Sequence, residues 1–456
     1  MTHDEALLVR IPIPEGSSLY PFQEEGVRFA FEHHRCLIAD QMGLGKTVQA
    51  ICLCNVLAYK ARDILIICPA SLKLNWQREW QRWSTRKGDQ VCVVNGNGWP
   101  VGANVVIVNY DLLRKYSTEL HAHFWDVLIC DESHYLKNSK SQRTREVMGQ
   151  WRQDDNGFWT QSVKPIQAGR MLFLSGTPLL NRPAELWTTC KALDPEQLGA
   201  MGRHAFEERY CDGFDDYYGW NNTGASNLRE LSQRVKAFTI RRTKEQVLTQ
   251  LPSKRLQVII LDTPRELRGT LEQEKAEYDK AMLRGGNIAF EMMSEVRKGV
   301  ALAKAKYVVE HLEDLLESES KIVCMAHHHE VIDRIADAFP ETSVVVDGRM
   351  SLRERQAAID RFQSDSSCKL LMGGIKVAGT GITLTAASVI VFAELDWTPG
   401  VLSQAEDRLH RIGQTRRVLI QHIVLDNSLD AHLVRLLVKK QRIINQVASG
   451  VCSHAI

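Results

Sequence analysis

Several features that mark common protein classes are missing from this 456-residue sequence. Its eleven cysteines are scattered and form no C-x-x-C pair, so we expect buried thiols in a reducing compartment and no zinc site. No apolar run approaches the roughly 18 residues of a membrane span, and the sequence does not open with a signal peptide. These absences predict a soluble intracellular protein without membrane partners, in the cytoplasm or nucleoid if it is prokaryotic or viral.

A large excess of charge of one sign is also missing. The formal net charge is only +2 and the pI is about 8.0, so the overall charge does not indicate a nucleic-acid-binding protein. Any DNA-binding surface must therefore be a local cluster of positive charge. The cluster Arg241-Arg242-Thr243-Lys244 is one basic candidate, although such a cluster is more commonly a solvated surface.

Two short patterns resemble binding sites, but neither supports the binding that it suggests. Gly43-Leu44-Gly45 and Gly379-Thr380-Gly381 begin like a dinucleotide fingerprint, but Val48 and Leu384 stand where a third glycine is needed. The run His327-His328-His329 has the composition of a metal site, yet polar residues at the exit of a strand are the commoner explanation. We therefore expect neither nicotinamide binding nor a metal at these histidines.

The alternation of apolar strands with longer mixed segments predicts an α/β fold with two lobes, each a parallel sheet flanked by helices. With 44% apolar residues the chain can bury a large core, and it is too long for one ordinary domain. Strands of the first lobe are predicted at residues 64–68, 91–94, 105–108, 127–130 and 171–174. Strands of the second lobe are predicted at residues 322–325, 343–346, 369–372, 389–392 and 419–424.

Between these two sets of strands the sequence changes character, with few strand signals and many helix formers. We therefore place the first lobe at residues 1–195, a helical segment between the lobes at 196–300, and the second lobe with a C-terminal helix at 301–456. Residues 213–224 are rich in Gly, Asp, Asn and Tyr and are predicted to form a mobile surface loop. Residues 154–169 are predicted to interrupt the first lobe.

The most informative stretch is the octapeptide DQMGLGKT at residues 40–47. An apolar segment leads into it and a helix-like segment leaves it, which predicts a strand, a phosphate-binding loop and a helix. Gly43 and Gly45 can adopt backbone angles closed to other residues, so successive N–H groups can turn toward phosphates. Lys46 would reach the β and γ phosphates and the Thr47 hydroxyl would hold Mg²⁺, although an aspartate replaces the usual first glycine.

An acidic pair follows a continuous apolar strand at residues 127–130. Asp131 and Glu132 would then lie at the carboxyl end of a buried strand, where open α/β sheets place ligands. Asp131 suits Mg²⁺ and Glu132 suits the orientation of an attacking water. The alternative is that this segment merely caps the next helix.

A third group of candidates lies in the last third of the chain. On a helix, Gln404, Arg408 and Arg411 would share one face, since they stand at i, i+4 and i+7. Such a face could present two guanidiniums to a γ-phosphate held by another domain, with Arg411 as an arginine finger. The alternative is a solvated, charged helix face.

The order of these blocks resembles that of superfamily 2 helicase-like ATPases, specifically the Swi/Snf-type double-stranded DNA translocases. Within that family, DESHYLKN, AHH and FAELDWTPG look closest to the annealing-helicase (HARP-like) branch. The resemblance runs from about residue 19 to about residue 414 and rests on YPFQ (20–23), DQMGLGKT (40–47), CPASLKLNW (68–76), VNYDLL (108–113), DESH (131–134), LSGTP (174–178), KIVCMAHH (321–328), VVDGRMS (345–351), VAGTGITLT (377–385) and the segment from Gln404.

The resemblance implies that both lobes are RecA-like, the first of them ATP-binding, and that residues 196–300 form helical protrusions and a linker. It also implies ATP and Mg²⁺ as cofactors and double-stranded or branched DNA as the partner. The catalytic residues that it implies are Lys46, Asp131, Glu132, Arg408 and Arg411, with Thr47 and Asp131 on Mg²⁺. The nucleotide would be bound by Gln23, which reads adenine, and by Gly43, Leu44, Gly45, Lys46, Thr47 and Gln404. DNA would be contacted by Ser71, Asn75, Tyr110, Gly379, Thr380, Gly381, Thr383 and Trp397, although Trp397 has a core position as its commoner alternative. Coupling between the two sites would fall to Ser175, Gly176 and Thr177.

These roles imply a motor that hydrolyses ATP on binding DNA and moves along the duplex, remodelling DNA structures or DNA–protein complexes without processive unwinding. A strand-separating helicase of the same superfamily is one alternative, and a nucleosome remodeller is another. An ATP-gated DNA clamp belongs to a different functional class and predicts damage at Glu132 or Arg411, which are both intact.

Overall fold

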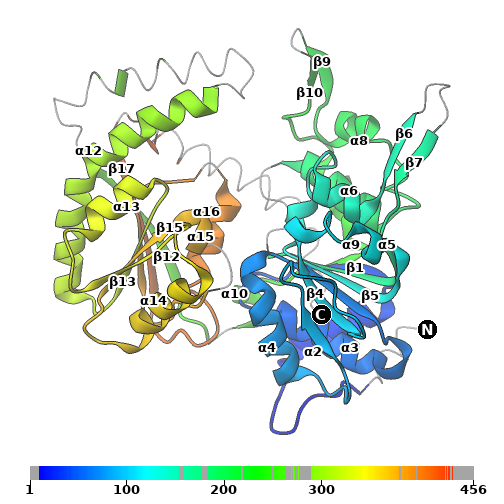
Figure 1. Ribbon diagram of the computed structural model, residues 1–456. Coiled ribbons are helices and arrows are strands. Elements are labelled where there is room, and N and C mark those ends of the chain that lie inside the picture. Colours follow the sequence, from blue (N-terminus) through cyan, green and yellow to red (C-terminus); the bar gives the residue numbers. More distant parts are fainter. Residues whose placement is uncertain are drawn as a thin grey trace. The chain divides into compact units, whose positions relative to one another are not determined.

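A computed structural model divides the chain into two compact units, of which the first runs to residue 249 and the second runs from residue 250 to 442 (Figure 1). The predicted middle domain is therefore split, since β11 (Thr239–Ile240) joins the first sheet and β12 (Lys254–Leu261) joins the second. The predicted boundaries at residues 195 and 300 do not match this division. The structure describes residues 10–153, 159–176, 182–216, 219–248, 250–261, 289–378, 382–396 and 398–426, together with a few single positions elsewhere.

A seven-stranded parallel sheet forms the centre of the first unit, in the order β11-β1-β8-β5-β2-β4-β3. All five strands predicted for this lobe are present, and two of them begin a few residues earlier than expected. Their runs of apolar residues are buried on both faces, as is usual in parallel sheets. The strands are β1 (Arg35–Ile38), β2 (Ile64–Cys68), β3 (Val91–Val93), β4 (Val105–Asn109), β5 (Phe124–Asp131) and β8 (Gln167–Leu174).

Helices pack on both faces of this sheet because neighbouring residues of each strand point to opposite sides. Leu37 of β1 belongs to one buried apolar cluster, with Phe206, whereas Ile38 belongs to a second cluster, with Ile51 and Trp76. The described helices of this unit are α2 (Pro21–Glu32), α3 (Lys46–Leu57), α4 (Lys73–Trp83), α5 (Ser117–Ala122), α6 (Gln142–Met148), α7 (Trp187–Leu193), α8 (Arg203–Tyr210), α9 (Leu228–Lys236) and α10 (Lys244–Val247).

Two antiparallel hairpins extend the first unit. One pairs β6 (Gln150–Gln153) with β7 (Trp159–Val163) and accounts for part of the predicted interruption, of which residues 154–158 lie outside the described chain. The other pairs β9 (Phe214–Asp216) with β10 (Gly219–Asn221). The segment predicted as a mobile surface loop, residues 213–224, therefore contains paired strands. Trp220 Nε1 anchors this hairpin by donating to Glu207 Oε2 at 2.8 Å.

The second unit contains a six-stranded parallel sheet in the order β12-β17-β16-β13-β15-β14. All five predicted strands are present, and the edge strand β12 is an addition. The two parallel sheets flanked by helices confirm the predicted fold class. The further strands are β13 (Ile322–Ala326), β14 (Ser343–Val346), β15 (Leu370–Gly374), β16 (Val389–Phe392) and β17 (Val418–Leu425).

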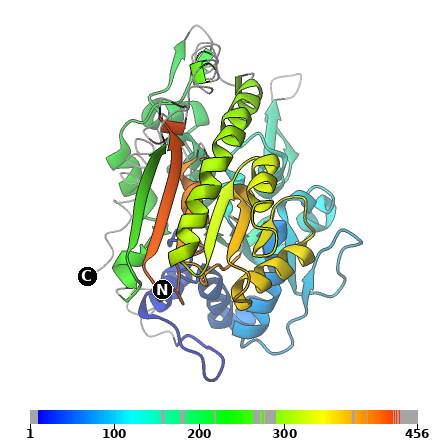
Figure 2. The ribbon, with the colours of Figure 1, turned by 90° about the vertical axis from the view of Figure 1, so that its left-hand side faces the viewer.

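Helix α12 (Ala289–Ser318) covers one face of the second sheet beside α13 (His329–Ala336), as Figure 2 shows. Its residues Ala301, Ala305, Val308 and Leu312 belong to one buried apolar cluster with residues of β13. The remaining described helices of this unit are α14 (Leu352–Ser364), α15 (Ile375–Ala378) and α16 (Pro399–Glu406).

Candidate nucleotide-binding site

The predicted phosphate-binding loop connects β1 to α3. Gly43 and Gly45 have φ angles of 86° and 79°, in the left-handed region that other residues rarely adopt. Helix α3 begins at Lys46, directly after Gly45, so its first N–H groups and the positive end of its dipole face the loop. The loop therefore has the backbone geometry of an anion site, as the sequence predicts.

Asp40, which replaces the usual first glycine of the loop, has a fully buried side chain. Its Oδ2 accepts hydrogen bonds from Arg242 Nη2 at 2.6 Å and from Gln49 Nε2 at 2.9 Å. Its Oδ1 accepts from Arg242 Nε at 2.9 Å. Arg242 also donates to the main-chain oxygen of Phe22 in α2. A buried carboxylate requires such pairing because an isolated buried charge is strongly unfavourable.

We predicted that the basic segment at residues 241–244 could form a DNA-binding surface. This prediction is wrong for two of its residues, which are buried. Arg242 is 7% exposed and Lys244 is 1% exposed. The guanidinium of Arg242 instead holds α2, the start of the phosphate loop and α3 together.

Gln23 lies directly against the phosphate loop and is buried. Its Oε1 accepts a hydrogen bond from Tyr20 N at 3.0 Å, and its Nε2 donates to Leu44 O at 3.1 Å. A Cβ atom on Gly45 would lie 2.4 Å from Gln23 Nε2, so a larger residue there would displace the Gln23 amide. Gln23 thus joins the start of α2 to the loop, and its contact with adenine stays a prediction.

Gln23→Ala is expected to raise the KM for ATP and to narrow the preference for ATP over GTP. A side-chain amide can both donate to and accept from the adenine edge, a pairing that guanine does not satisfy. Steady-state hydrolysis of both nucleotides measures the ratio, with Glu24→Ala on the same helix as the control. If Gln23 only supports the loop, the two KM values will rise together and the ratio will stay unchanged.

The acidic pair lies at the carboxyl end of β5. Asp131 is 6% exposed, its Oδ2 accepts from Trp76 Nε1 at 2.7 Å, and its Oδ1 accepts from Glu132 N at 2.9 Å. Burial and the neighbouring Glu132 carboxylate raise the pKa of Asp131 to about 6. A cation beside it would favour the ionised form. Together, Asp131 and the Thr47 hydroxyl on the first turn of α3 are oxygen donors that suit Mg²⁺.

Glu132 has an unusual backbone conformation. Its φ of 49° and ψ of 51° lie in the left-handed region, where few residues other than glycine are found. Residues held in this way cluster at functional sites. Its Oε2 lies 3.3 Å from His134 Nδ1, and the same nitrogen lies 3.5 Å from Ser175 Oγ. Contacts therefore connect Glu132 with the segment that follows β8.

That segment, Ser175 and Gly176, also packs against the phosphate loop. Ser175 is fully buried. A Cβ atom on Gly176 would lie 3.2 Å from Lys46 Nζ and 2.3 Å from Met42 Cγ. The two residues therefore lie between the acidic pair and the loop, a position that suits coupling, whereas Thr177 lies outside the described residues.

The residues predicted to contact DNA in the first unit differ in their exposure to solvent. Asn75 is exposed on α4, and Ser71 is partly exposed in the short helix η2 (Ala70–Leu72) before it. Tyr110 is 3% exposed, and its hydroxyl donates to the main-chain oxygen of Asp131 at 2.8 Å. A DNA contact by the Tyr110 side chain does not fit this burial, and we correct that prediction to a role in the core.

The segment predicted to carry an arginine finger is not one continuous helix. Helix α16 ends at Glu406, and residues 407–412 form turns, so Gln404, Arg408 and Arg411 do not share a helix face as predicted. After the end of the helix, Gln414 Nε2 donates to the main-chain oxygen atoms of Leu409 and Ala387, at 3.3 and 2.8 Å.

Arg408 and Arg411 nevertheless differ in their exposure to solvent. Arg408 is 6% exposed, whereas Arg411 is partly exposed, and its Nη1 donates to Thr383 Oγ1 at 2.9 Å. Arg411 thus lies beside a residue predicted to contact DNA. Gln404 is buried. Gly379, Thr380, Gly381 and Trp397 lie outside the described residues.

Comparison with protein families matches both units. A model of the SNF2-related domain matches residues 22–297, and a model of the helicase conserved C-terminal domain matches residues 303–413. The chain belongs to the SNF2-related family. The resemblance indicated by the series of motifs is therefore confirmed.

Relatives of this SNF2-related chain include longer proteins. It is 36% identical to SWI/SNF-related matrix-associated actin-dependent regulator of chromatin subfamily A-like protein 1 of Xenopus tropicalis, over 96% of this chain and 47% of that protein. It is 34% identical to DNA annealing helicase and endonuclease ZRANB3 of Homo sapiens, over 97% of this chain and 42% of that protein. The chain thus spans about half the length of these relatives.

A solved structure to which this chain is similar is the SWI2/SNF2 ATPase core of Sulfolobus solfataricus in complex with double-stranded DNA. The alignment covers 97% of this chain and 96% of that one, with 21% sequence identity and a TM-score of 0.47.

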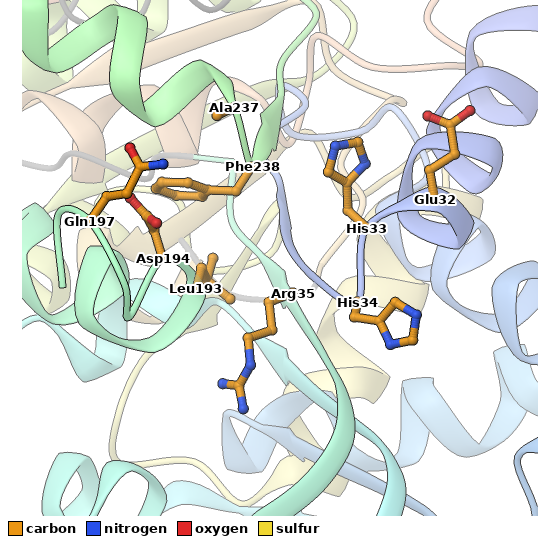
Figure 3. A pocket seen from close by; sticks show the side chains of 9 residues that line it. All are labelled: Glu32, His33, His34, Arg35, Leu193, Asp194, Gln197, Ala237 and Phe238. Atoms are coloured by element: carbon orange, nitrogen blue, oxygen red, sulfur yellow. The ribbon is translucent and has the colours of Figure 1, made fainter. Parts of the chain in front are cut away.

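A pocket of about 380 Å³ in the first unit does not belong to the SNF2-related nucleotide site (Figure 3). It is lined by His33, Arg35, Leu193 and Phe238, among others. Arg35 begins β1, whereas the phosphate loop follows the other end of that strand. Parallel sheets bind their ligands at the carboxyl ends of strands, so this pocket is at the opposite edge from the candidate site.

The cysteines and the histidine run behave largely as the sequence predicts. Nine of the ten described cysteines are buried, and burial raises the thiol pKa, for Cys36 to about 12. His328 Nδ1 lies 2.6 Å from Glu394 Oε1, so it is a paired polar residue after a strand. Among the described residues, no helix is long and apolar enough to span a membrane.

Sequence reasoning missed two residues of this SNF2-related site. The pairing of Arg242 with Asp40 was not predicted from the sequence, although an aspartate in place of the first glycine requires a cation nearby. Trp76 was part of a quoted motif, but nothing in the sequence connects its indole with Asp131, which lies 55 positions further along the chain.

Proposed function

We propose that the chain is a DNA-dependent ATPase that moves along duplex DNA and remodels DNA structures or DNA–protein complexes without processive strand separation. The observation that supports it most is the convergence of the phosphate loop, the acidic pair and the Ser175–Gly176 segment at one edge of the first sheet. Family membership and the human relative named as an annealing helicase support the choice of DNA. An enzyme with this substrate works inside the cell, so an intracellular location is part of the proposal.

The residues of the first unit have the chemistry for hydrolysis of ATP to ADP and phosphate. The loop N–H groups and Lys46 bind and compensate the phosphate charge, and Thr47 and Asp131 would hold Mg²⁺. The bound ion supplies further charge compensation on the phosphates. Glu132 orients the attacking water, which suits a reaction that depends more on positioning and charge than on covalent chemistry.

Arginines of the second unit would complete the site when the two units close on ATP. Arg411 is the better candidate for the finger because it is partly exposed, whereas Arg408 is buried. Loss of the γ-phosphate removes the anion that Arg411 stabilises, so hydrolysis would favour reopening.

The protein would move along DNA if each unit binds one stretch of the DNA backbone. Ser71 and Asn75 would bind phosphates for the first unit, and Thr383 with residues 379–381 would bind them for the second. Closing and reopening would change the separation of these contacts along one strand and so advance the protein. Because contacts with phosphates carry no direct sequence information, we expect little sequence preference.

Displacement of a triplex-forming third strand from duplex DNA tests this movement. We expect ATP-dependent displacement by the parent protein and none by Lys46→Ala, with little unwinding of a tailed duplex measured in parallel. DNA affinity should fall with salt by about 0.9 log unit per log unit of salt for each phosphate neutralised. Efficient unwinding without third-strand displacement would favour the strand-separating helicase. DNA binding gated by ATP but without hydrolysis would favour the clamp.

A further inference from the structure

Trp76 connects the metal-binding carboxylate with a segment predicted to contact DNA. Its side chain is fully buried on α4, and its Nε1 donates to Asp131 Oδ2 at 2.7 Å. The indole is only a donor, so it requires an acceptor when it is buried. A distance of this length is typical of a hydrogen bond to a charged acceptor.

The carboxylate of Asp131 is fixed by donors on both sides. Trp76 holds Oδ2, and the main-chain N–H of Glu132 holds Oδ1. An ionised carboxylate has about four acceptor sites, so these two bonds leave room for a cation. A shift of the indole would therefore change the orientation of Asp131 without removing its capacity to bind Mg²⁺.

The residue before Trp76 faces the solvent and not the core. Asn75 is exposed, as is Leu74, whereas Trp76 is buried, because successive residues of a helix point about 100° apart. Ser71 lies in the turn immediately before the same helix. One continuous segment thus presents the predicted DNA contacts to solvent and the indole to Asp131.

We propose that Trp76 is a positioning residue that transmits DNA binding at residues 71–75 to the Mg²⁺-binding carboxylate of Asp131. This inference rests on the proposed function, since it assumes that the segment binds DNA and that Asp131 holds the metal. Linkage is reciprocal: if DNA binding improves the orientation of Asp131, DNA must tighten the binding of Mg²⁺ with nucleotide.

The test is a Mg²⁺ titration of the binding of a fluorescent ATP analogue, with and without saturating duplex DNA. In the parent protein, DNA should lower the Mg²⁺ concentration at half-saturation by about fivefold or more. Trp76→Phe keeps an aromatic ring but lacks the donor. It should raise this concentration by about 10-fold or more, because a hydrogen bond to a charged group is lost, and it should abolish the shift caused by DNA.

Trp80→Phe is the matched control, since Trp80 lies one turn further on α4, is buried, and donates to Asp89 Oδ2 at 3.3 Å. It should keep the shift caused by DNA. Equal behaviour of Trp76→Phe and Trp80→Phe, or a Trp76→Phe protein that keeps the parent's shift, would overturn the proposal.

Asn75→Ala provides a second test that leaves the indole in place, and it decides the matter if Trp76→Phe does not fold. At a DNA concentration that saturates the variant itself, DNA should shift its Mg²⁺ half-saturation much less than it shifts that of the parent. A shift as large as the parent's would show that the signal does not pass through residues 71–75. A parent protein without any shift would overturn the inference. If DNA also failed to stimulate ATP hydrolysis by the parent, the proposed function itself would fail, which separate rate measurements distinguish.

Discussion

Arg411→Ala is expected to lower the rate of DNA-stimulated ATP hydrolysis by about 10³- to 10⁵-fold, which is the usual contribution of an arginine finger. Nucleotide affinity should stay near that of the parent, because the finger acts on charge that develops in the transition state. The effect should therefore appear in kcat, with little change in the affinity for ATP. Steady-state kinetics with saturating duplex DNA, combined with equilibrium binding of nucleotide, measures both quantities.

Arg416→Ala is the control for this experiment. Arg416 is an exposed arginine of the same unit, and its Nη2 donates to the main-chain oxygen of Ala386 at 2.6 Å, much as Arg411 donates to Thr383. Its removal should have little effect on kcat. Hydrolysis by Arg411→Ala at the parent rate with DNA present would show that the finger assignment is wrong.

The second large effect is expected for Glu132→Gln, which should still bind Mg²⁺ and ATP but lose turnover by about 10²- to 10⁴-fold. The amide keeps the shape of the side chain but cannot orient and deprotonate the attacking water in the same way. Lys46→Ala should differ from it by also weakening nucleotide binding. Nucleotide binding and single-turnover hydrolysis distinguish the two variants.

Glu146→Gln provides a matched control for the loss of a buried carboxylate. Glu146 is 7% exposed in the same unit and accepts from Ser117 Oγ at 2.7 Å, outside the candidate site. It should hydrolyse ATP at a rate close to the parent's. A Glu132→Gln protein that turns over as fast as Glu146→Gln would remove Glu132 from the catalytic residues.

Most of the fold could be predicted because parallel strands buried on both faces are continuous apolar runs. The strands at residues 64–68 and 389–392 illustrate this, since both were predicted with the bounds that they have. The strand β12 was missed because it is an edge strand with exposed residues, and its first two positions, Lys254 and Arg255, are charged. Strands of this kind lack the apolar continuity on which the prediction depends.

The candidate site was predictable where its chemistry is local in sequence. The glycines of the phosphate loop have the backbone angles that their sequence implies, and Asp131 and Glu132 lie at the end of a buried strand. The pairing of Asp40 with Arg242 joins residues 202 positions apart, and no periodicity indicates such a contact. Equally, the i, i+4, i+7 spacing of Gln404, Arg408 and Arg411 did not reveal that the helix ends at Glu406.

The measurement that tests the central claim most directly is the steady-state rate of ATP hydrolysis with duplex DNA, single-stranded DNA, forked DNA and RNA compared side by side. Lys46→Ala serves as the inactive control in each case. The account predicts low hydrolysis by the parent without nucleic acid and strong stimulation by duplex or forked DNA. Stimulation by RNA alone, or hydrolysis that no DNA changes, would contradict it.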